Sequence, residues 1–473
     1  MIKAITQKLS KSKLIKGGIW YTIGNLFLQG ISFLTMPIFT KVLKLTTGEF
    51  GIINTYTTWL AVFTSIVSLG LVASVSRGKY DFEDKYDDFL SSIMLLSTLC
   101  FGVFITLTLI FQKFISNFIS LTPILVKLLI LQSFCAFIID FCNTKFTIEY
   151  KYKKYLFVSI TSTLLNVILS IVFISYMTVN RHMGRIIAGA LITLIYGIVL
   201  YFSIIRKGKF SIEKKYWKYA LAISVPLIPH SLSGIILSQF DRVMIQKMVG
   251  DAATGIYSFA YNVGMILSVV WTALNKAWVP YFFESMEQNK YDDIREKCKY
   301  YIGIFSLITF VLIFVSPEIG KLMASKDFWV GLDLVPVVII GYFFVFLYSL
   351  PSNLEFYAKK THLISIGTFG AGFLNIFLNA IFIRKYGYGA AAWTTLVSYI
   401  ALFIFHYVIA AKISENKIFE LKYFIYSTIF VSISGYVFYI IKYNWLMRYG
   451  CVLLVMFVLA YIIQKKLKIK FKS

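Results

Sequence analysis

The sequence predicts an all-α membrane protein of about fourteen transmembrane helices, arranged as two pseudo-symmetric six-helix lobes followed by a C-terminal helix pair. Three observations predict this architecture: the composition, the spacing of long apolar runs, and an internal repeat. Hydrophobic residues make up 58% of the 473 residues and charged residues only 15%, against roughly 25% charged in soluble proteins. A single soluble core does not bury that much apolar surface, so lipid is the expected solvent.

The charge balance fits a membrane protein better than a nucleic-acid-binding protein. Lys and Arg exceed Asp and Glu by 25, but the cations form short clusters between apolar runs, and no basic soluble domain is left to bind nucleic acid. The five cysteines are isolated, without CxxC or Cys/His spacing, so neither a zinc site nor a disulfide framework is expected. The sequence predicts no metal and no cofactor.

Long apolar stretches recur along the whole chain, and each is long enough for a helix of about 20 residues to cross a bilayer. Fourteen such stretches are predicted, centred near Phe27, Phe63, Leu99, Leu131, Asn166, Leu194, Ile228, Gly264, Thr309, Ile340, Gly372, Val397, Val431 and Leu454. They leave little chain for a soluble domain. The first stretch offers no small-residue cleavage site, so we expect it to be a retained helix and not a signal peptide.

Basic residues are unevenly divided between alternate connections. The set of connections that includes the N-terminus holds about three times as many Lys and Arg as the opposite set. Because cytoplasmic loops of membrane proteins are enriched in basic residues, this bias places both termini in the cytoplasm. The expected location is a bacterial inner membrane, crossed many times.

Two halves of the chain resemble each other. Residues 164–174 match residues 373–383, with Asn166 opposite Asn375, and similar matches at an offset of about 200 residues pair helix 1 with 7 and helix 6 with 12. Such a parallel repeat is typical of transporters. It predicts lobes at residues 1–210 and 211–415, with a terminal pair and basic tail at 416–473. Two facing lobes that rock against each other would give alternating access.

Several motifs resemble a known family. They are "MPIFTKVLKLTTGEFGIINTY" at residues 36–56, the Pro-x-x-Pro-His start and Asp-Arg pair within residues 224–266, "NKAWVPYFFE" and "NLEFYAKKT". With these motifs the sequence resembles the Wzx-type polysaccharide flippases, in the superfamily that also holds the lipid II flippase MurJ and the MATE drug exporters. One departure concerns the arginines. The chain has eight in all, carries Lys41 where the family often has Arg, and lacks the arginines of helices 1 and 2 that line the MurJ cavity.

The resemblance implies a transporter that moves an undecaprenyl-diphosphate-linked oligosaccharide from the cytoplasmic to the outer leaflet, for O-antigen or capsule assembly. Its implied partners are that lipid-linked sugar, membrane lipids, and polysaccharide polymerase and chain-length proteins. Two alternatives remain open: a MATE-like ion-coupled exporter of small organic molecules, and a membrane glycosyl polymerase. No P-loop, H-E-x-x-H or G-x-S-x-G motif occurs, so the sequence predicts no enzyme and no catalytic residue.

Ionisable residues inside membrane helices are functional candidates by default. Lys127 could contact phosphate or snorkel to the outer surface, and Asp140 could hold a proton or ion or pair with Lys145. Arg77 and Lys276 lie at the cytoplasmic ends of helices 2 and 8, where a diphosphate would first enter or where basic residues anchor the helices. These four residues are candidate cavity contacts.

Helix 7 carries the remaining candidates. Pro226 and Pro229 should bend it, which predicts a hinge and leaves carbonyls free near His230, a candidate lining residue that could bond those carbonyls instead. Asp241 and Arg242 follow near the outer end. They are read either as a local ion pair that stabilises the helix end or as substrate contacts.

Overall fold

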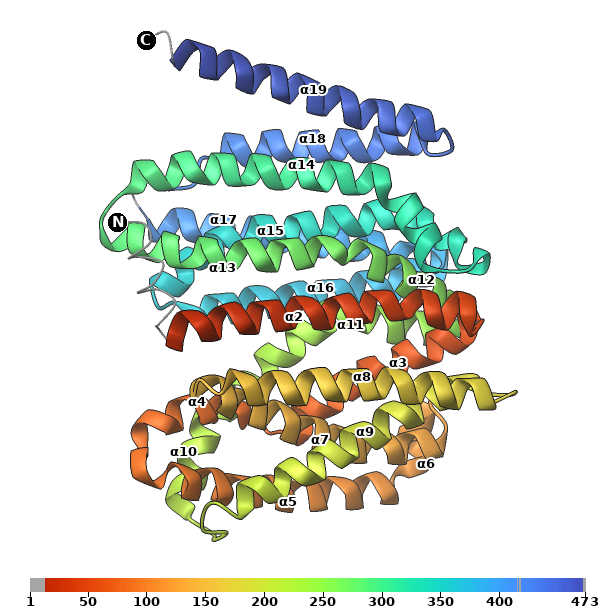
Figure 1. The fold of residues 1–473 in the computed structure, drawn as a ribbon, viewed down its shortest axis with the longest axis vertical. Coiled ribbons are helices and arrows are strands. Elements are labelled where there is room, and N and C mark those ends of the chain that lie inside the picture. Colours follow the sequence, from red (N-terminus) through yellow and green to blue (C-terminus); the bar gives the residue numbers. More distant parts are fainter. Residues whose placement is uncertain (1–12, 415, 417, 471–473) are drawn as a thin grey trace. The chain divides into compact units, whose positions relative to one another are not determined.

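The structure is a computed structural model that describes residues 13–414, 416 and 418–470, and these residues form helices joined by short connections (Figure 1). Thirteen helical segments within them are long and apolar enough to cross a membrane, and they coincide with the first thirteen predicted spans. The predicted fourteenth span falls on α19, Trp445–Lys470. Within α19, Trp445–Leu459 is an apolar helix shorter than the thirteen spans, and the fourteenth span stays a prediction.

The helices follow one another with few interruptions. The first half contains α2 Lys13–Pro37, the π-helical η1 Ile38–Val42, α3 Thr47–Val67, α4 Val72–Asp81, η2 Glu83–Lys85, α5 Tyr86–Ile110, α6 Gln112–Ile119, α7 Pro123–Ile148, α8 Tyr152–Tyr176, α9 Arg181–Ile205, α10 Lys214–Ser224, η3 Val225–Leu227 and α11 Ile228–Met248. The second half contains α12 Asp251–Gly264, α13 Ile266–Glu287, α14 Tyr291–Met323, η4 Lys326–Leu334, α15 Val335–Tyr357, α16 Thr361–Tyr386, α17 Ala390–Ile413, α18 Leu421–Ile441 and α19.

The chain forms two compact units. The first extends to Ser258 and includes Ile376–Tyr388, and the second comprises Phe259–Asn375 and continues from Gly389. These units are defined by packing, whereas the predicted boundaries at residues 210 and 415 are defined by the sequence repeat. The lobe boundaries therefore stay a prediction.

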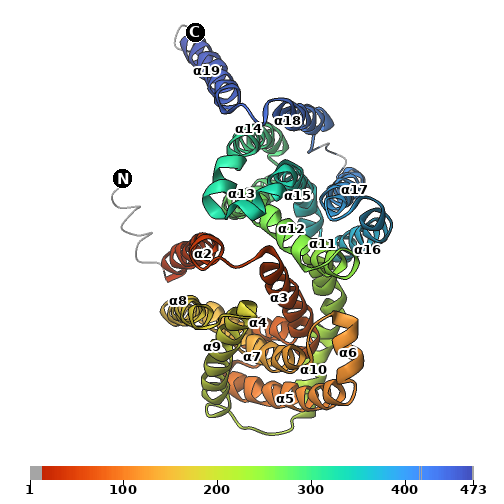
Figure 2. The same cartoon turned by 90° about the vertical axis from the view of Figure 1, so that its right-hand side faces the viewer.

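Helix α7 is the central helix of the first unit. It packs against α3, α4, α5, α6, α8 and α9, and α5, α7, α8 and α9 run alongside one another in both views (Figures 1 and 2). The contact with α9 is close, because a Cβ on Gly197 would lie 2.5 Å from the Cβ of Cys135. Small residues that let helix backbones approach are typical of packing in membranes, where lipid tails remove the hydrophobic driving force.

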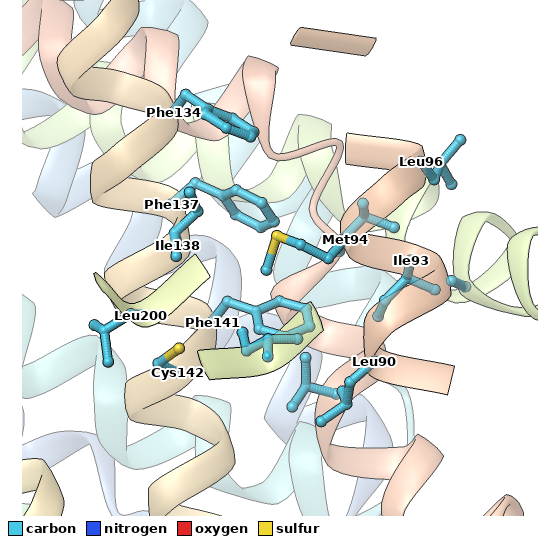
Figure 3. Packing of buried hydrophobic residues seen from close by; sticks show 14 of the residues in the cluster. Leu90, Ile93, Met94, Leu96, Phe134, Phe137, Ile138, Phe141, Cys142 and Leu200 are labelled. Atoms are coloured by element: carbon cyan, nitrogen blue, oxygen red, sulfur yellow. The ribbon is translucent and has the colours of Figure 1, made fainter. Parts of the chain in front are cut away.

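Large apolar side chains fill the space between α5 and α7. Phe137 and Phe141 of α7 lie next to Leu90 and Met94 of α5, and all four are buried (Figure 3). Dispersion contacts between such closely packed side chains stabilise the unit, since many small attractions add up. These contacts fix α7 against α5.

Two spans of the first unit are interrupted. The expected bend of helix 7 lies at η3, a 3₁₀ turn that contains Pro226, and Pro229 is the second residue of α11. Near His230, the Ser233 hydroxyl donates to Pro229 O over 2.6 Å and the Ser231 hydroxyl to Ile228 O over 3.0 Å. The carbonyls that the two prolines leave without a helical donor lie four residues before each proline, so their freedom to bind something stays a prediction.

The second interruption, between α3 and α4, contacts the first. Gly70 adopts a φ of +65°, and a Cβ on it would lie 2.7 Å from Ser224 O. The hydroxyl oxygens of Ser65 and Ser231 are 3.0 Å apart, which adds a hydrogen bond across the same point. The second and seventh spans therefore change direction where they touch.

Helix α15 is the central helix of the second unit. It packs against α13, α14, α17 and α18, and most of its side chains are buried. At the edge of this unit, Arg448 of α19 donates to Glu318 Oε2 of α14 over 2.8 Å and to Phe314 O over 2.6 Å. This ion pair fixes the start of α19 against α14.

Topology provides a first test. Reporter fusions at Lys209 and Lys290, in the α9–α10 and α13–α14 connections, should report a cytoplasmic location, and fusions at Asn180 and Asp251, at the opposite helix ends, should report a periplasmic one. The expected pattern follows from the excess of basic residues in one set of connections. A periplasmic signal at Lys209 would contradict both the orientation and the span count.

A second test concerns the contact of the two interruptions. Gly70→Ala should lower thermal stability, because a left-handed conformation costs a residue with a Cβ about 1–2 kcal/mol and the new methyl would meet Ser224 O. Gly234→Ala in α11 is the matched control, since nothing lies within 4 Å of its Cβ position. Equal melting temperatures of the two purified variants would contradict a close contact at Gly70.

Candidate functional site

A chain of polar side chains crosses the interior of the first unit. The Tyr56 hydroxyl of α3 donates to Gln132 Oε1 of α7 over 2.8 Å, and Gln132 Nε2 donates to Thr193 Oγ1 of α9 over 3.4 Å. Gly189 leaves room beside them, because a Cβ there would lie 3.7 Å from Asn166 and 3.8 Å from Gln132. Three transmembrane helices are therefore joined by polar groups deep within the unit.

Arg185 brings a positive charge to the same region. It lies on α9, about 6 Å of helical rise inside the start at Arg181. Its Nη1 donates to Asn166 Oδ1 and, over 2.9 Å, to Ser170 Oγ. The guanidinium carbon lies 5.2 Å from the centre of the Phe39 ring. α8, α9 and η1 together hold this side chain.

The partners of Arg185 are electrically neutral. No carboxylate oxygen of the described residues lies within 4.0 Å of its guanidinium, and the hydrogen bonds above go to an amide and a hydroxyl. Asn166 lies about 15 Å of helical rise from the end of α8 at Tyr176. The arginine therefore reaches toward the membrane interior, whereas a snorkelling side chain would reach toward the nearer water.

Sequence reasoning missed Arg185. By sequence it lies at the outer end of the span centred near Leu194, one turn after Arg181, which donates to Leu43 O, and it was not singled out as a candidate. The sequence does hold a signal, since Asn166 and Ser170 are one helical turn apart and put two polar groups on one face of an otherwise apolar helix. Only the structure shows that Arg185 joins them.

The two candidates on α7 lie far apart. Lys127 is exposed, one turn inside the start of the helix, and Asp140 is exposed near the other end. The expected alternative partner of Asp140 is engaged elsewhere, because buried Lys145 bonds Asp87 and lies 3.9 Å from Glu149. About 20 Å of helical rise separates Lys127 from Asp140, so they cannot share one small ligand group.

Asp241 is fully buried in α11. Its Oδ1 accepts from Asn379 Nδ2 over 2.6 Å and its Oδ2 from the Tyr257 hydroxyl over 2.5 Å, while Arg242 donates to Ser238 O over 3.2 Å. Neighbouring residues on a helix point in different directions. The Asp241 carboxylate therefore joins α11 to α12 and α16, a contact that the prediction of a local ion pair with Arg242 did not include.

The remaining candidates are more peripheral. The exposed side chain of Arg77, on α4, lies 3.4 Å from Asp81, a surface pair one turn apart that contributes little stability. Lys276 is exposed on α13. The imidazole Nδ1 of His230 is buried and has no hydrogen-bond partner among the described residues.

The fold is similar to that of two solved membrane-protein structures. The lipid II flippase MurJ in an inward closed conformation matches with a TM-score of 0.70 over 95% of this chain and 99% of that chain, at 18% identity. An inward-facing multidrug resistance MATE family transporter of the MOP superfamily matches with a TM-score of 0.65 over 83% of this chain and 98% of that chain, at 14% identity.

The sequence comparisons give the family. Residues 14–286, more than half of the chain, match the family described as polysaccharide biosynthesis protein, and the chain belongs to this family. A protein of the Lsg locus of Haemophilus influenzae is 25% identical over 374 residues, 75% of this chain and 87% of that protein. A second membrane protein of Haemophilus influenzae is 26% identical over 364 residues, which are 74% of this chain and 86% of that protein. The resemblance found in the sequence is confirmed for the family and the fold.

The buried Asp241 contact predicts a clear loss of stability on truncation. Asp241→Ala should lower the free energy of unfolding by about 1–3 kcal/mol, because Asn379 and Tyr257 lose their acceptor inside the unit. Asp292→Ala is the control, since that carboxylate is 94% exposed and its surface pair with Arg295 contributes little. Thermal melts of both purified variants measure the difference, and similar shifts would contradict a structural role for Asp241.

Proposed function

We propose that the chain is a flippase that moves an undecaprenyl-diphosphate-linked oligosaccharide from the cytoplasmic to the outer leaflet, for O-antigen or capsule assembly. Two findings support the proposal: membership of a polysaccharide biosynthesis family and a fold shared with a lipid II flippase. A sugar diphosphate does not cross hydrocarbon unaided, because unpaired charge there is costly. A protein path for the head group is therefore required.

The surroundings of Arg185 are the observation that supports an anionic cargo. A guanidinium among apolar helices is costly unless it meets negative charge, and here its partners are an amide, a hydroxyl and an aromatic ring. Its planar donors suit phosphate oxygens, which they bind in pairs. The proposal is that a phosphate of the cargo supplies the negative charge that the first unit does not place beside Arg185.

Other candidates take secondary roles in this proposal. Lys127, Arg77 and Lys276 are proposed contacts toward the two ends of the path, and Pro226 and Pro229 are the proposed hinge. The lobes would rock as alternating access requires. In keeping with a parallel repeat, the central helices α7 and α15 belong to the fourth and tenth spans, six apart like the paired helices of the repeat.

Two alternatives compete with this proposal. A MATE-like exporter of small organic cations shares the fold, and it would use carboxylates such as Asp140 and Asp241 as cargo contacts; Asp241 is already bonded to Asn379 and Tyr257. A glycosyl polymerase would need a long outer catalytic loop, and the described outer connections are short or helical. The neutral surroundings of Arg185 favour an anionic cargo.

The proposed setting is a bacterial inner membrane, with both termini in the cytoplasm. Helices that cross many times and the membrane proteins among the relatives make the chain a multi-pass membrane protein. Basic residues concentrated at one end of the helices support the orientation. Polysaccharide polymerase and chain-length proteins are the proposed neighbours in that membrane, since they would receive the exported sugar.

Reconstitution tests the proposed activity. The full chain in lipid vesicles should accelerate the exposure of a polyprenyl-diphosphate-linked oligosaccharide to a membrane-impermeant glycosidase, compared with protein-free vesicles. An organic dye cation is the competing cargo, and its accumulation should not depend on the protein. Transport of the cation without the lipid-linked sugar would overturn the flippase proposal in favour of an exporter.

Substitutions at the basic residues test the assigned contact. Arg185→Gln should slow flipping about 10- to 100-fold, since a hydrogen bond to a charged group contributes about 1.5–3 kcal/mol, and Arg185→Lys should retain more activity. Arg384→Gln, at an exposed position in the last turn of α16, is the matched control. Lys127→Arg should retain more flipping activity than Lys127→Gln if a positive charge is needed at this position. Normal flipping by Arg185→Gln would remove that residue from the proposal.

A further inference from the structure

The second unit contains an acid and a base that are buried together. Glu355 of α15 and His406 of α17 are both 0% exposed, and Glu355 Oε1 lies 2.7 Å from His406 Nδ1. α15 and α17 are the most closely packed helices of this unit. The pair therefore lies where water and lipid do not reach it.

Both residues also carry an atom without a partner. Glu355 Oε2 and His406 Nε2 are buried and have no hydrogen bond among the described residues. Buried polar groups are normally satisfied, so two such atoms on one contacting pair need an explanation. A dedicated structural clamp between α15 and α17 would satisfy them, and this pair leaves both open.

The Glu355–His406 pair differs from the other carboxylate contacts described above because both of its members can exchange a proton. Glu318 bonds Arg448, which stays charged, and Asp241 bonds an amide and a phenol. In the Glu355–His406 pair both members change charge by gaining or losing a proton, and histidine does so near neutral pH. Nothing else in the contact needs to break for a proton to arrive or leave.

The net charge of the Glu355–His406 pair depends on whether it holds an added proton. With neutral imidazole and ionised carboxylate the pair carries one negative charge, and one added proton makes it neutral, as imidazolium with carboxylate or as imidazole with carboxylic acid. Unpaired charge is costly in an apolar interior, so gain or loss of this proton changes the net charge that the second unit must accommodate. The proton comes from water and returns to water, which balances the step.

We propose that Glu355 and His406 form a proton-binding site inside the second unit, and that its occupancy controls the packing of α16. A proton on His406 Nε2 creates a donor that faces α16, where a Cβ on Gly367 would lie 3.1 Å from that nitrogen. The Gly367 backbone is thus close to the new N–H. A donor without an acceptor at this contact favours a rearranged α16, which couples the proton to movement.

Aromatic and titratable groups surround the pair. The Tyr348 ring stacks on His406 with centroids 5.6 Å apart, and Tyr407 of α17 donates to Phe419 O. Other titratable or charged groups at this end of the surrounding elements include Lys276, Tyr281, Glu284 and Glu287 of α13, Asp292, Asp293, Arg295, Glu296, Lys297, Lys299, Tyr300 and Tyr301 of α14, Tyr357 of α15, His362 of α16, Lys412 of α17, and Lys422, Tyr423 and Tyr426 of α18. Among the described residues, the ion pair between Glu355 and His406 joins only these two residues.

Hydrogen exchange of the full chain in lipid nanodiscs tests the site. After correction for intrinsic rates, amides of α16 and α17 in the unaltered protein should exchange several-fold faster at about pH 6 than at about pH 8, a range in which histidine changes charge. Glu355→Gln and His406→Gln should each abolish this difference. His406→Gln keeps a side-chain amide that can donate to Glu355, and His362→Gln, at an exposed position, is the matched control that should retain the difference.

Two results would overturn the proposal. One is an unaltered protein whose α16 and α17 exchange equally at both pH values, and the other is a pH difference that survives Glu355→Gln. If Glu355→Gln does not fold, Glu355→Asp keeps an acid and should keep the pH difference. A purely structural pair would lower the melting temperature in His406→Gln while leaving the pH dependence unchanged. The exchange experiment needs no transported cargo, so its outcome is independent of the proposed flippase activity.

Discussion

Backbone hydrogen bonding in hydrocarbon is the constraint on which the rest of this structure depends. A chain in lipid must satisfy its own N–H and C=O groups, and a helix does so within one segment. Where the helices of the first unit are interrupted, side chains take over. The Gly70 N–H donates to Ser68 Oγ and the Ser74 hydroxyl donates to Leu71 O, while serines of α11 cover the carbonyls beside the prolines. Interruptions are tolerated because hydroxyls lie next to them.

The same scarcity of partners makes polar side chains informative. In a soluble core an unpaired polar atom can often find water, but inside the described spans polar groups bond their own helix, meet another helix or stay open. Asp241 meets two neighbouring helices, whereas Arg185 meets only neutral groups and the Glu355–His406 pair leaves two atoms without bonds. Incomplete bonding of a charged or titratable side chain is thus what draws attention to these two places.

The sequence predicted what depends on local pattern. Apolar stretches located the thirteen spans, and Pro226 located the 3₁₀ turn, because both follow from a few adjacent residues. Long-range partners were not predictable in this way. Lys145 is five residues from Asp140 but bonds Asp87 on another helix, and Arg185 was not recognised as a candidate because its partner Asn166 lies on another helix.

The central position of α15 has a consequence for how the protein is made. A helix leaves the insertion machinery soon after its synthesis, and the helices of this unit already made when α15 emerges are α13, α14 and the end of α12. Its most extensive partner, α17, begins at Ala390, after the whole of α16 has been synthesised. Until then the face that carries Glu355 has no His406 to meet. Chain growth through Ile413 is therefore the step at which the second unit can close around its buried acid, and a ribosome stalled before that point would leave a carboxylate facing lipid.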